Sequence, residues 1–221
     1  SAHLNKPVHE MTLEQYEKVF SSMRHPLKTV IMTGGEPFLR IDIVGIIKIL
    51  DKYKTEKINI PTNATLPTIV FKKVKEILDN TNIDLNIQVS IDGPEDLHDE
   101  IRGMKGSYKK CIEAIKLLKD LKKDYKNFDV TVSTTISRRN IDRVKELAES
   151  IKELGVFHGI QFIRSSALQT FDIDQNILSD FNPKDEVLGV EEMEELSKFI
   201  NEQNKGVNHL LGKTISLVND H

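Results

Sequence analysis

Val30-Ile-Met-Thr-Gly-Gly-Glu-Pro-Phe-Leu-Arg40 runs from an apolar strand into two glycines, an acid and a proline. Gly34 and Gly35 let a ligand approach the main chain where a side chain would block it. Pro37 fixes the exit of the turn and removes one donor. Glu36 offers a carboxylate beside main-chain carbonyls, which suits a ligand that carries an ammonium group. Two interpretations follow: a ligand-binding turn, or an ordinary tight turn between a strand and a helix.

Strand-like and helix-like segments alternate on both sides of this turn. The periodicity predicts strands near 28–33, 57–61, 84–91, 129–136 and 159–164. It predicts helices that begin at or after Thr12 (a capping box with Gln15), Asp42, Ser107 and Asn140, one that carries Val70 to Leu78, and one around Glu191–Asn201. Strands that alternate with helices imply right-handed βαβ units in a parallel sheet, either open or closed into a barrel.

The strand near 84–91 separates these two options. Its apolar positions alternate with polar ones, Leu85, Ile87, Val89 and Ile91 against Asn86, Gln88, Ser90 and Asp92. Successive side chains point to opposite faces of a sheet, so one face packs on helices and the other is polar. A doubly wound sheet favours continuous apolar runs, and a closed eight-stranded barrel fills its interior with branched apolar side chains. The alternation therefore favours an incomplete or wide barrel with a polar, ligand-holding interior.

Composition limits the classes of partner. A chain of 221 residues with 38% hydrophobic content can form one large domain. Its 31 basic and 34 acidic residues give a formal charge of -3, which argues against a nucleic-acid or membrane partner bound through bulk charge. No apolar run approaches the ~20 residues of a membrane span, and no signal-peptide pattern is present. A single cysteine fits a reducing setting, so we expect a cytoplasmic protein.

Three further motifs follow the glycine turn in order: Pro61-Thr-Asn-Ala64, Val89-Ser-Ile-Asp-Gly-Pro94 and His98-Asp-Glu-Ile-Arg-Gly103. Over about residues 12 to 165 this ordered set resembles the radical S-adenosylmethionine (radical SAM, AdoMet) enzymes. In that family a Gly-Gly-Glu-Pro turn after the second barrel strand holds the methionine part of AdoMet. The resemblance implies a partial (β/α)6 TIM-like α/β barrel, with the first strand and the cluster loop missing here. The family's Cys-x3-Cys-x2-Cys loop is absent from the sequence, whose one cysteine is Cys111.

The resemblance also implies an AdoMet site at the carboxyl ends of the strands, where barrel enzymes hold their ligands. The residues it implies for AdoMet binding are Gly34, Gly35, Glu36, Pro37, Asn63, Ser90, Asp92 and Arg102. From the residues alone, Asn63 and Asp92 are equally turn residues, and Arg102 is equally a solvated surface arginine. Resemblance to the branch that makes the molybdenum-cofactor precursor implies that Arg40 and Thr62 face the substrate.

Other titratable residues are assigned structural roles. Cys111 lies on the apolar stripe of its helix, which predicts a buried thiol. His98 and Asp99 match a common family pattern and are assigned to the structure of their loop. His3 and His9 lack the spacing of metal ligands, and no residue of this chain is predicted to bind a metal.

The resemblance implies an enzyme. In the family, a [4Fe–4S] cluster on three cysteine thiolates leaves one iron open for AdoMet. Reduction cleaves AdoMet to a 5′-deoxyadenosyl radical, which modifies a substrate. Here that substrate would be a small molecule or a peptide, such as a cofactor precursor or a peptide under modification, and the reductant a flavodoxin or ferredoxin. Without the three cysteines, we expect this polypeptide to be inactive by itself.

Two alternatives remain at this point. The first is a degenerate barrel that acts as a non-catalytic nucleoside- or partner-binding module. The second is a metal-independent barrel enzyme that uses Glu36 and Asp92 as acid and base.

The sequence divides into three expected regions. Residues 1–165 form the barrel core, 166–189 a long loop or lid, and 190–221 a terminal helix and tail. Because the chain begins at Ser1 and ends abruptly, we expect it to be a piece of a longer gene product, with a further C-terminal domain compatible with its end.

Overall fold

The computed structural model describes residues 10–162 and 188–203. Two compact units divide the chain. The first comprises Ser1–Ile136 and Arg143–Phe162, and the second comprises Ser137–Asp142 and Ile163–His221. The strands β1 to β5 and the predicted site residues all fall in the first unit.

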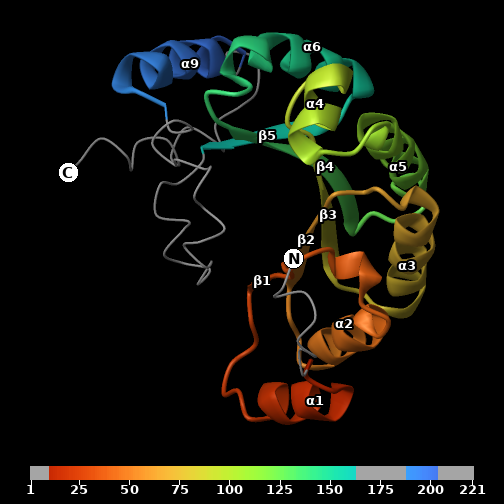
Figure 1. Cartoon of the computed structure of the whole chain (residues 1–221). Coiled ribbons are helices and arrows are strands. Elements are labelled where there is room, and N and C mark those ends of the chain that lie inside the picture. Colours follow the sequence, from red (N-terminus) through yellow and green to blue (C-terminus); the bar gives the residue numbers. More distant parts are fainter. Residues whose placement is uncertain (1–9, 163–187, 204–221) are drawn as a thin grey trace, which may run out of the picture. The chain divides into compact units, whose positions relative to one another are not determined.

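The first unit is built on a parallel sheet whose strands follow chain order (Figure 1). The strands are β1 (Thr29–Ile31), β2 (Lys57–Thr62), β3 (Asp84–Ser90), β4 (Phe128–Ile136) and β5 (Phe157–Phe162). Each pairs only with its neighbours in the sequence, so the five-stranded sheet has the order β1-β2-β3-β4-β5. The register places Thr62 beside Val89, and Ser90 beside Ser133. The carboxyl ends of the strands therefore lie along one edge.

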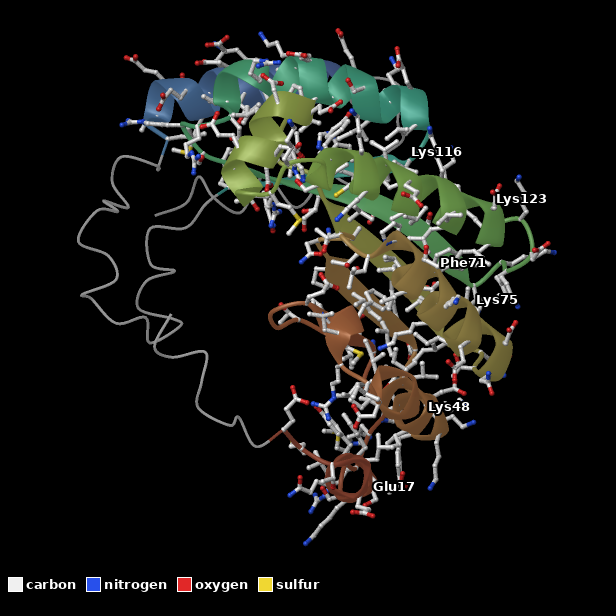
Figure 2. All side chains as sticks on the ribbon, turned by 45° about the vertical axis from the view of Figure 1, so that its right-hand side comes forward. Glu17, Lys48, Phe71, Lys75, Lys116 and Lys123 are labelled. Carbon is white, nitrogen blue, oxygen red and sulfur yellow. The ribbon has the colours of Figure 1, made fainter. Side chains whose placement is uncertain are left out.

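Helices connect the strands and cover one face of the sheet. They are α1 (Leu13–Ser21), α2 (Ile43–Lys52), α3 (Pro67–Asn80), α4 (Glu95–Arg102), α5 (Ser107–Leu121) and α6 (Val144–Leu154), with short 3-10 helices η2 (Pro37–Leu39) and η3 (Ile141–Arg143). Figure 1 shows α2, α3 and α5 along the outside of the curled sheet. In Figure 2 the side chains of Lys48, Lys75 and Lys116 project away from it. This arrangement confirms the predicted partial α/β barrel.

The hydrophobic core lies between these helices and the outer face of the sheet. Leu85, Ile87 and Val89 of β3 are fully buried in it. The alternate residues Asn86 and Gln88 are half-buried on the opposite, concave face. The alternation predicted from the sequence is therefore confirmed.

Several predicted helix boundaries are confirmed and one is wrong in detail. Thr12 and Gln15 form the predicted capping box of α1, and Gly155 ends α6 in the left-handed region, with φ 63°. Asp42 occupies the N-cap position of α2 but makes no side-chain cap hydrogen bond. Its carboxylate instead accepts from Nε of Arg40 at 2.7 Å, because a guanidinium makes a stronger, charge-assisted hydrogen bond than a main-chain amide.

The segment after β4 also differs from expectation. The helix predicted to start at Asn140 begins as η3, and α6 starts only at Val144. Asn140 Oδ1 accepts from the main-chain nitrogen of Ser137 at 2.8 Å, within the second unit. The helix predicted around Glu191–Asn201 is confirmed as α9 (Val190–Gln203).

Some predictions lie outside the described residues. They include most of the predicted loop or lid, the two ends of the chain with His3 and His9, and the last two residues of the fifth predicted strand, 163 and 164. None of the helices within 10–162 and 188–203 has the length and hydropathy needed to cross a bilayer.

Candidate functional site

The turn after β1 leaves its main chain uncovered. A Cβ added to Gly34 or Gly35 would meet no atom of residues 10–162 or 188–203 within 4 Å, and neither glycine has a positive φ. Both residues are exposed. Neither backbone strain nor internal packing therefore requires glycine at these positions. Close approach of a ligand to the backbone would require it.

Glu36 fastens this turn to the end of β2. One carboxylate oxygen, Oε1, accepts from the Thr62 hydroxyl at 2.8 Å and from the Phe38 nitrogen at 3.2 Å. The other, Oε2, accepts from the Asn63 nitrogen at 2.8 Å. A carboxylate has about four acceptor sites, so this network leaves about one for a ligand. Glu36 thus has a structural role that its position in the motif did not predict.

Lys73 holds the same turn from the side of α3. Its ammonium group donates to the carbonyl oxygens of Phe38 at 2.9 Å and of Arg40 at 2.7 Å. Sequence reasoning missed Lys73. No motif marks it, because a lysine on a helix is ordinarily a solvated residue.

The two predicted substrate-side residues are engaged within the chain. Thr62 is 2% exposed, and its hydroxyl donates to Glu36 and accepts from the nitrogen of Ala64. Arg40 pairs with Asp42, and this hydrogen bond is the main cause of the raised pKa of Arg40. Its guanidinium also donates to the Met11 carbonyl oxygen at 2.5 Å. Their substrate contacts stay predictions.

Asn63 combines a turn role with one unused donor. Its Oδ1 accepts from the nitrogen and the hydroxyl of Thr65 at 3.0 and 2.9 Å, which is the turn that the alternative interpretation predicted. Among the described residues no acceptor lies within hydrogen-bond distance of its Nδ2. This amide group is therefore free to donate to a ligand at the carboxyl edge.

Asp92 and Arg102, both predicted to contact AdoMet, contact each other. Arg102 Nη2 lies 2.7 Å from Asp92 Oδ2, and the nitrogen of Thr135 donates to Asp92 Oδ1 at 3.3 Å. The Asp92 side chain is 8% exposed and that of Arg102 is 36% exposed. The pair therefore ties the loop after β3 to α4 and β4. Ser90, two residues before Asp92, is half-buried on the concave face.

His98 is buried beneath the loop after β3 and is hydrogen-bonded to it. Its Nδ1 accepts from the nitrogen of Asp92 at 3.1 Å, which assigns the proton to Nε2, 3.8 Å from the Cys111 sulfur. The ring is 1% exposed. Desolvation lowers the pKa of His98, with opposing contributions from nearby charges. A neutral ring that accepts from the loop fits the structural role predicted for it.

Asp99 has a second structural role. Its carboxylate accepts from the nitrogens of Gly106 and Tyr108 and from the hydroxyl of Ser107. These donors lie at the first turn of α5, so Asp99 caps that helix from the preceding one.

Two substitutions of His98 test the hydrogen bond that its Nδ1 accepts from Asp92. His98→Phe is expected to lower the free energy of unfolding by ~1–3 kcal/mol, because the Asp92 nitrogen loses its acceptor. His98→Asn is expected to lose less, because an amide oxygen can take the place of Nδ1. Since the folded pKa is lowered, the wild type should lose stability as pH falls below ~6.5, and His98→Asn should lose less over the same range. Urea unfolding at pH 7.5 and 5.5 measures both effects, and equal stability of all three proteins would contradict this role.

The described residues do not fit an iron–sulfur cluster. No three His, Cys, Asp or Glu side chains gather in 10–162 and 188–203 in a way that could hold a metal ion. Cys111 is buried, as predicted, and desolvation raises the pKa of its thiol to about 12. Iron binds the thiolate, so Cys111 is a poor ligand.

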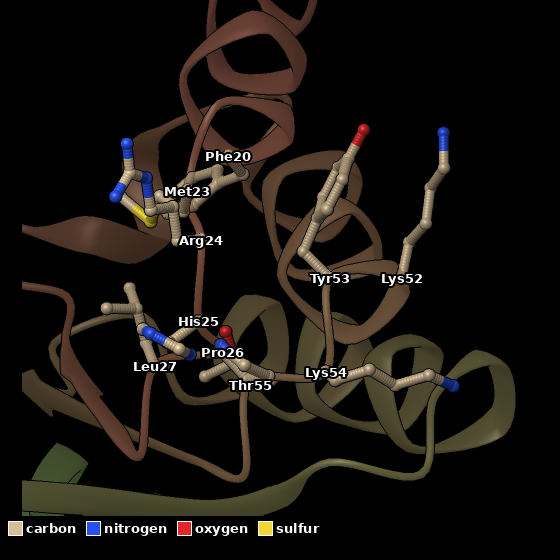
Figure 3. Close-up of a pocket in the computed structure, with 10 residues that line it drawn as sticks. All are labelled: Phe20, Met23, Arg24, His25, Pro26, Leu27, Lys52, Tyr53, Lys54 and Thr55. Carbon is tan, nitrogen blue, oxygen red and sulfur yellow. The ribbon is translucent and has the colours of Figure 1, made fainter.

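A pocket of about 190 Å³ lies at the opposite edge of the sheet (Figure 3). Leu27 and Thr55 line it, each two residues before a strand, at the amino ends of β1 and β2. The glycine turn follows the carboxyl end of β1. Barrel enzymes bind ligands at the carboxyl edge, so this pocket is separate from the candidate site.

Comparison with known proteins agrees with the fold and identifies the family. The profile of the Radical SAM superfamily matches residues 2–151. AdoMet-dependent heme synthase of Methanosarcina barkeri is 30% identical over 154 residues, which cover 67% of this chain and 40% of that protein. Sporulation killing factor maturation protein SkfB of Bacillus subtilis is 28% identical over 149 residues, which cover 67% and 34%.

The fold is also that of a solved structure, native anSMEcpe with bound AdoMet. The TM-score is 0.52 at 16% identity, over 68% of this chain and 41% of that one. The chain spans about 40% or less of the length of the two curated relatives. The profile match covers well over half of the chain and spans the glycine turn and the strands β1 to β4. The chain belongs to the Radical SAM superfamily.

Proposed function

We propose that this chain is the AdoMet-binding core of a radical SAM enzyme. The uncovered main chain of Gly34 and Gly35 carries the proposal, because it stands at the carboxyl edge and no atom of the described residues would contact a Cβ placed there. The carbonyls of this turn and the remaining acceptor site of Glu36 suit the ammonium group of the methionine part. The Asn63 amide and the Ser90 hydroxyl suit its carboxylate or the ribose. Asp92 and Arg102 act by shaping the loop, through their contact with each other.

In the longer protein, a bound [4Fe–4S] cluster would supply the electron that splits AdoMet into methionine and a 5′-deoxyadenosyl radical, which is the chemistry of the superfamily. With Cys111 as its one cysteine, this chain does not supply the three thiolates for that cluster. Its own residues bind and orient AdoMet and hold the loops around it. We therefore assign cluster binding to the longer protein, with a flavodoxin or ferredoxin as the reductant.

The substrate of the longer protein is a peptide or a cofactor precursor in this proposal. The names of the two relatives support both classes: one is a heme synthase, and the other matures a sporulation killing factor. The identities of 28–30% do not choose between them.

Anaerobic reconstitution with iron and sulfide tests the enzyme proposal. The longer protein is expected to take up a [4Fe–4S] cluster and to form 5′-deoxyadenosine from AdoMet after reduction. The 221-residue chain treated in the same way is expected to do neither, because Cys111 is its one cysteine. Absence of both cluster and product from the longer protein would overturn the enzyme proposal.

The isolated, buried Cys111 favours one second candidate, a non-catalytic module that binds a nucleoside or a partner. AdoMet binding by a longer protein that takes up no cluster would support this candidate instead. The acid–base alternative is disfavoured. Glu36 is held by three protein donors, and Asp92 is paired with Arg102, so neither carboxylate is placed to move a proton to or from a substrate.

A further inference from the structure

The concave face of the sheet is unusual for parallel strands. Parallel sheets ordinarily have both faces covered by apolar layers. Here the described helices of the first unit cover the outer face (Figure 1). The inner face carries polar side chains along its central strands β3 and β4, with the exposed apolar side chains of Ile31 on β1 and Phe157 on β5 at its two sides. The polar centre of this face does not complete a hydrophobic core and suits a polar ligand.

A ladder of side-chain hydrogen bonds crosses this face. Asn86 Nδ2 donates to Asn59 Oδ1 at 2.8 Å and to Thr131 Oγ1 at 3.2 Å. Asn59 Nδ2 donates to Gln88 Oε1 at 3.4 Å. The ladder thus joins β2, β3 and β4 through their inward side chains. On β5, Gln161 Nε2 makes a similar bond to Thr135 Oγ1 at 3.1 Å.

The ladder leaves one donor group and one acceptor unused. Gln88 Nε2 has no acceptor among the described residues. Asn86 Oδ1 is the buried side-chain oxygen that has no partner in the same part of the chain. Because this oxygen is closed to solvent, the Asn86 side chain must rotate before a ligand can reach it. A free N–H group and a free oxygen on one strand complement a C=O and an N–H on the same side of a peptide main chain, two residues apart.

The absence of charged side chains at the described positions in the middle of the concave face limits the class of ligand further. Ionisable side chains occur at its amino edge, where Lys57 pairs with Asp84 at 3.7 Å and Lys122 with Asp129 at 2.8 Å. From Asn59, Asn86 and Thr131 up to Ser90, the inward strand positions of the described residues are neutral. A phosphate or carboxylate placed there would lose its hydration without gaining a cation.

The spacing fits an extended chain. Asn86 and Gln88 are two residues apart on one face, which separates them by about 6.7 Å. The same-side groups of an extended peptide repeat at the same interval. Gln88 in turn lies about 6.7 Å along β3 from Ser90, the proposed AdoMet contact. A peptide on the ladder would therefore reach the neighbourhood of the AdoMet site.

We propose that Asn59, Asn86 and Gln88 form a subsite that binds the uncharged main chain of a peptide substrate. The inference rests on the proposed function, because it places the subsite beside the AdoMet pocket. It selects a peptide over an anionic cofactor precursor. It also assigns specificity to three residues on the concave face that no motif of the sequence marked.

The side-chain NH2 signals of these residues in NMR spectra give a direct test. The ¹⁵N-labelled chain is titrated with N-acetyl-triglycine N-methylamide, an uncharged peptide main chain without side chains, both with and without AdoMet. Parallel titrations use glutarate and tripolyphosphate. The peptide probe is expected to shift the signals of Asn59, Asn86 and Gln88, and the two anions are not. No shift of these signals with the peptide probe, or equal shifts with the anions, would overturn the proposal.

Substitutions test whether the Gln88 side chain itself binds the peptide probe. Gln88→Ala is expected to weaken binding of the peptide probe about fivefold, the effect of one neutral hydrogen bond. Asn80→Ala is the matched control, because Asn80 lies at the end of α3 and donates to the Glu76 carbonyl. Equal affinity in wild type and Gln88→Ala would also count against the subsite.

AdoMet binding is followed in the same samples by the main-chain signals of Gly34 and Gly35. If AdoMet shifts the signals of Gly34 and Gly35 but the peptide probe does not shift those of Asn59, Asn86 and Gln88, the subsite alone is contradicted. If the peptide probe shifts its three signals but AdoMet does not shift those of the two glycines, only the AdoMet proposal is contradicted.

Discussion

Replacing Gly35 with valine is expected to weaken AdoMet binding about 10- to 100-fold while leaving the stability of the chain unchanged. The side chain would enter space that the described part of the chain leaves empty, so folding of that part meets no clash. A ligand against the same backbone would meet one, and an overpacked contact costs ~1–3 kcal/mol. Isothermal titration with AdoMet and urea unfolding of both proteins measure the two effects.

Lys28→Val is the control for this substitution, because Lys28 is exposed and precedes β1 at the opposite edge of the sheet. Its AdoMet affinity should equal that of the wild type. If Gly35→Val bound AdoMet as tightly as the wild type, the glycine turn would be an ordinary turn. If Gly35→Val unfolded, the space above Gly35 would not be open.

Replacing Glu36 with alanine should lower the free energy of unfolding by ~2–4 kcal/mol. The substitution leaves the nitrogens of Phe38 and Asn63 and the hydroxyl of Thr62 without their acceptor. Hydrogen bonds to a charged group contribute ~1.5–3 kcal/mol each, and these three are only partly buried because the Glu36 carboxylate is partly open to solvent. Water recovers part of the loss. Urea unfolding of the purified variant measures it.

Glu36→Gln removes only part of the acceptor capacity of Glu36 and is a second test of the same hydrogen bonds. The single side-chain oxygen of the amide can accept either from Thr62 and Phe38 or from Asn63. Its NH2 group then faces a main-chain N–H group, which is also a donor. We expect a loss of stability between those of the wild type and Glu36→Ala. Wild-type stability in both variants, with only AdoMet affinity reduced, would mean that Glu36 acts mainly on the ligand and would contradict its structural role.

The fold was predictable because it depends on local patterns. Alternation in β3 distinguishes its two faces without knowledge of any contact, and the burial of Leu85, Ile87 and Val89 follows it. Helix ends such as the Thr12 capping box depend on neighbours three residues away. Asp42 departs from expectation because a nearby guanidinium competes for its carboxylate.

The internal contacts of the site were not predictable in the same way. Glu36 meets Thr62 across 26 positions of sequence, and Lys73 reaches Arg40 across 33. These contacts arise only when the ends of neighbouring strands come together. A motif predicts which residues lie at the carboxyl edge, but it does not predict which of them hold each other, as Asp92 and Arg102 do.

Titration of the ¹⁵N-labelled chain with AdoMet, up to millimolar concentration, tests the proposed AdoMet site most directly. We expect saturable shifts in the main-chain signals of Gly34, Gly35 and Ser90, with those of Leu27 and Thr55 in the opposite pocket unchanged. Shifts confined to the opposite pocket, or no saturable shift at the carboxyl edge, would contradict it.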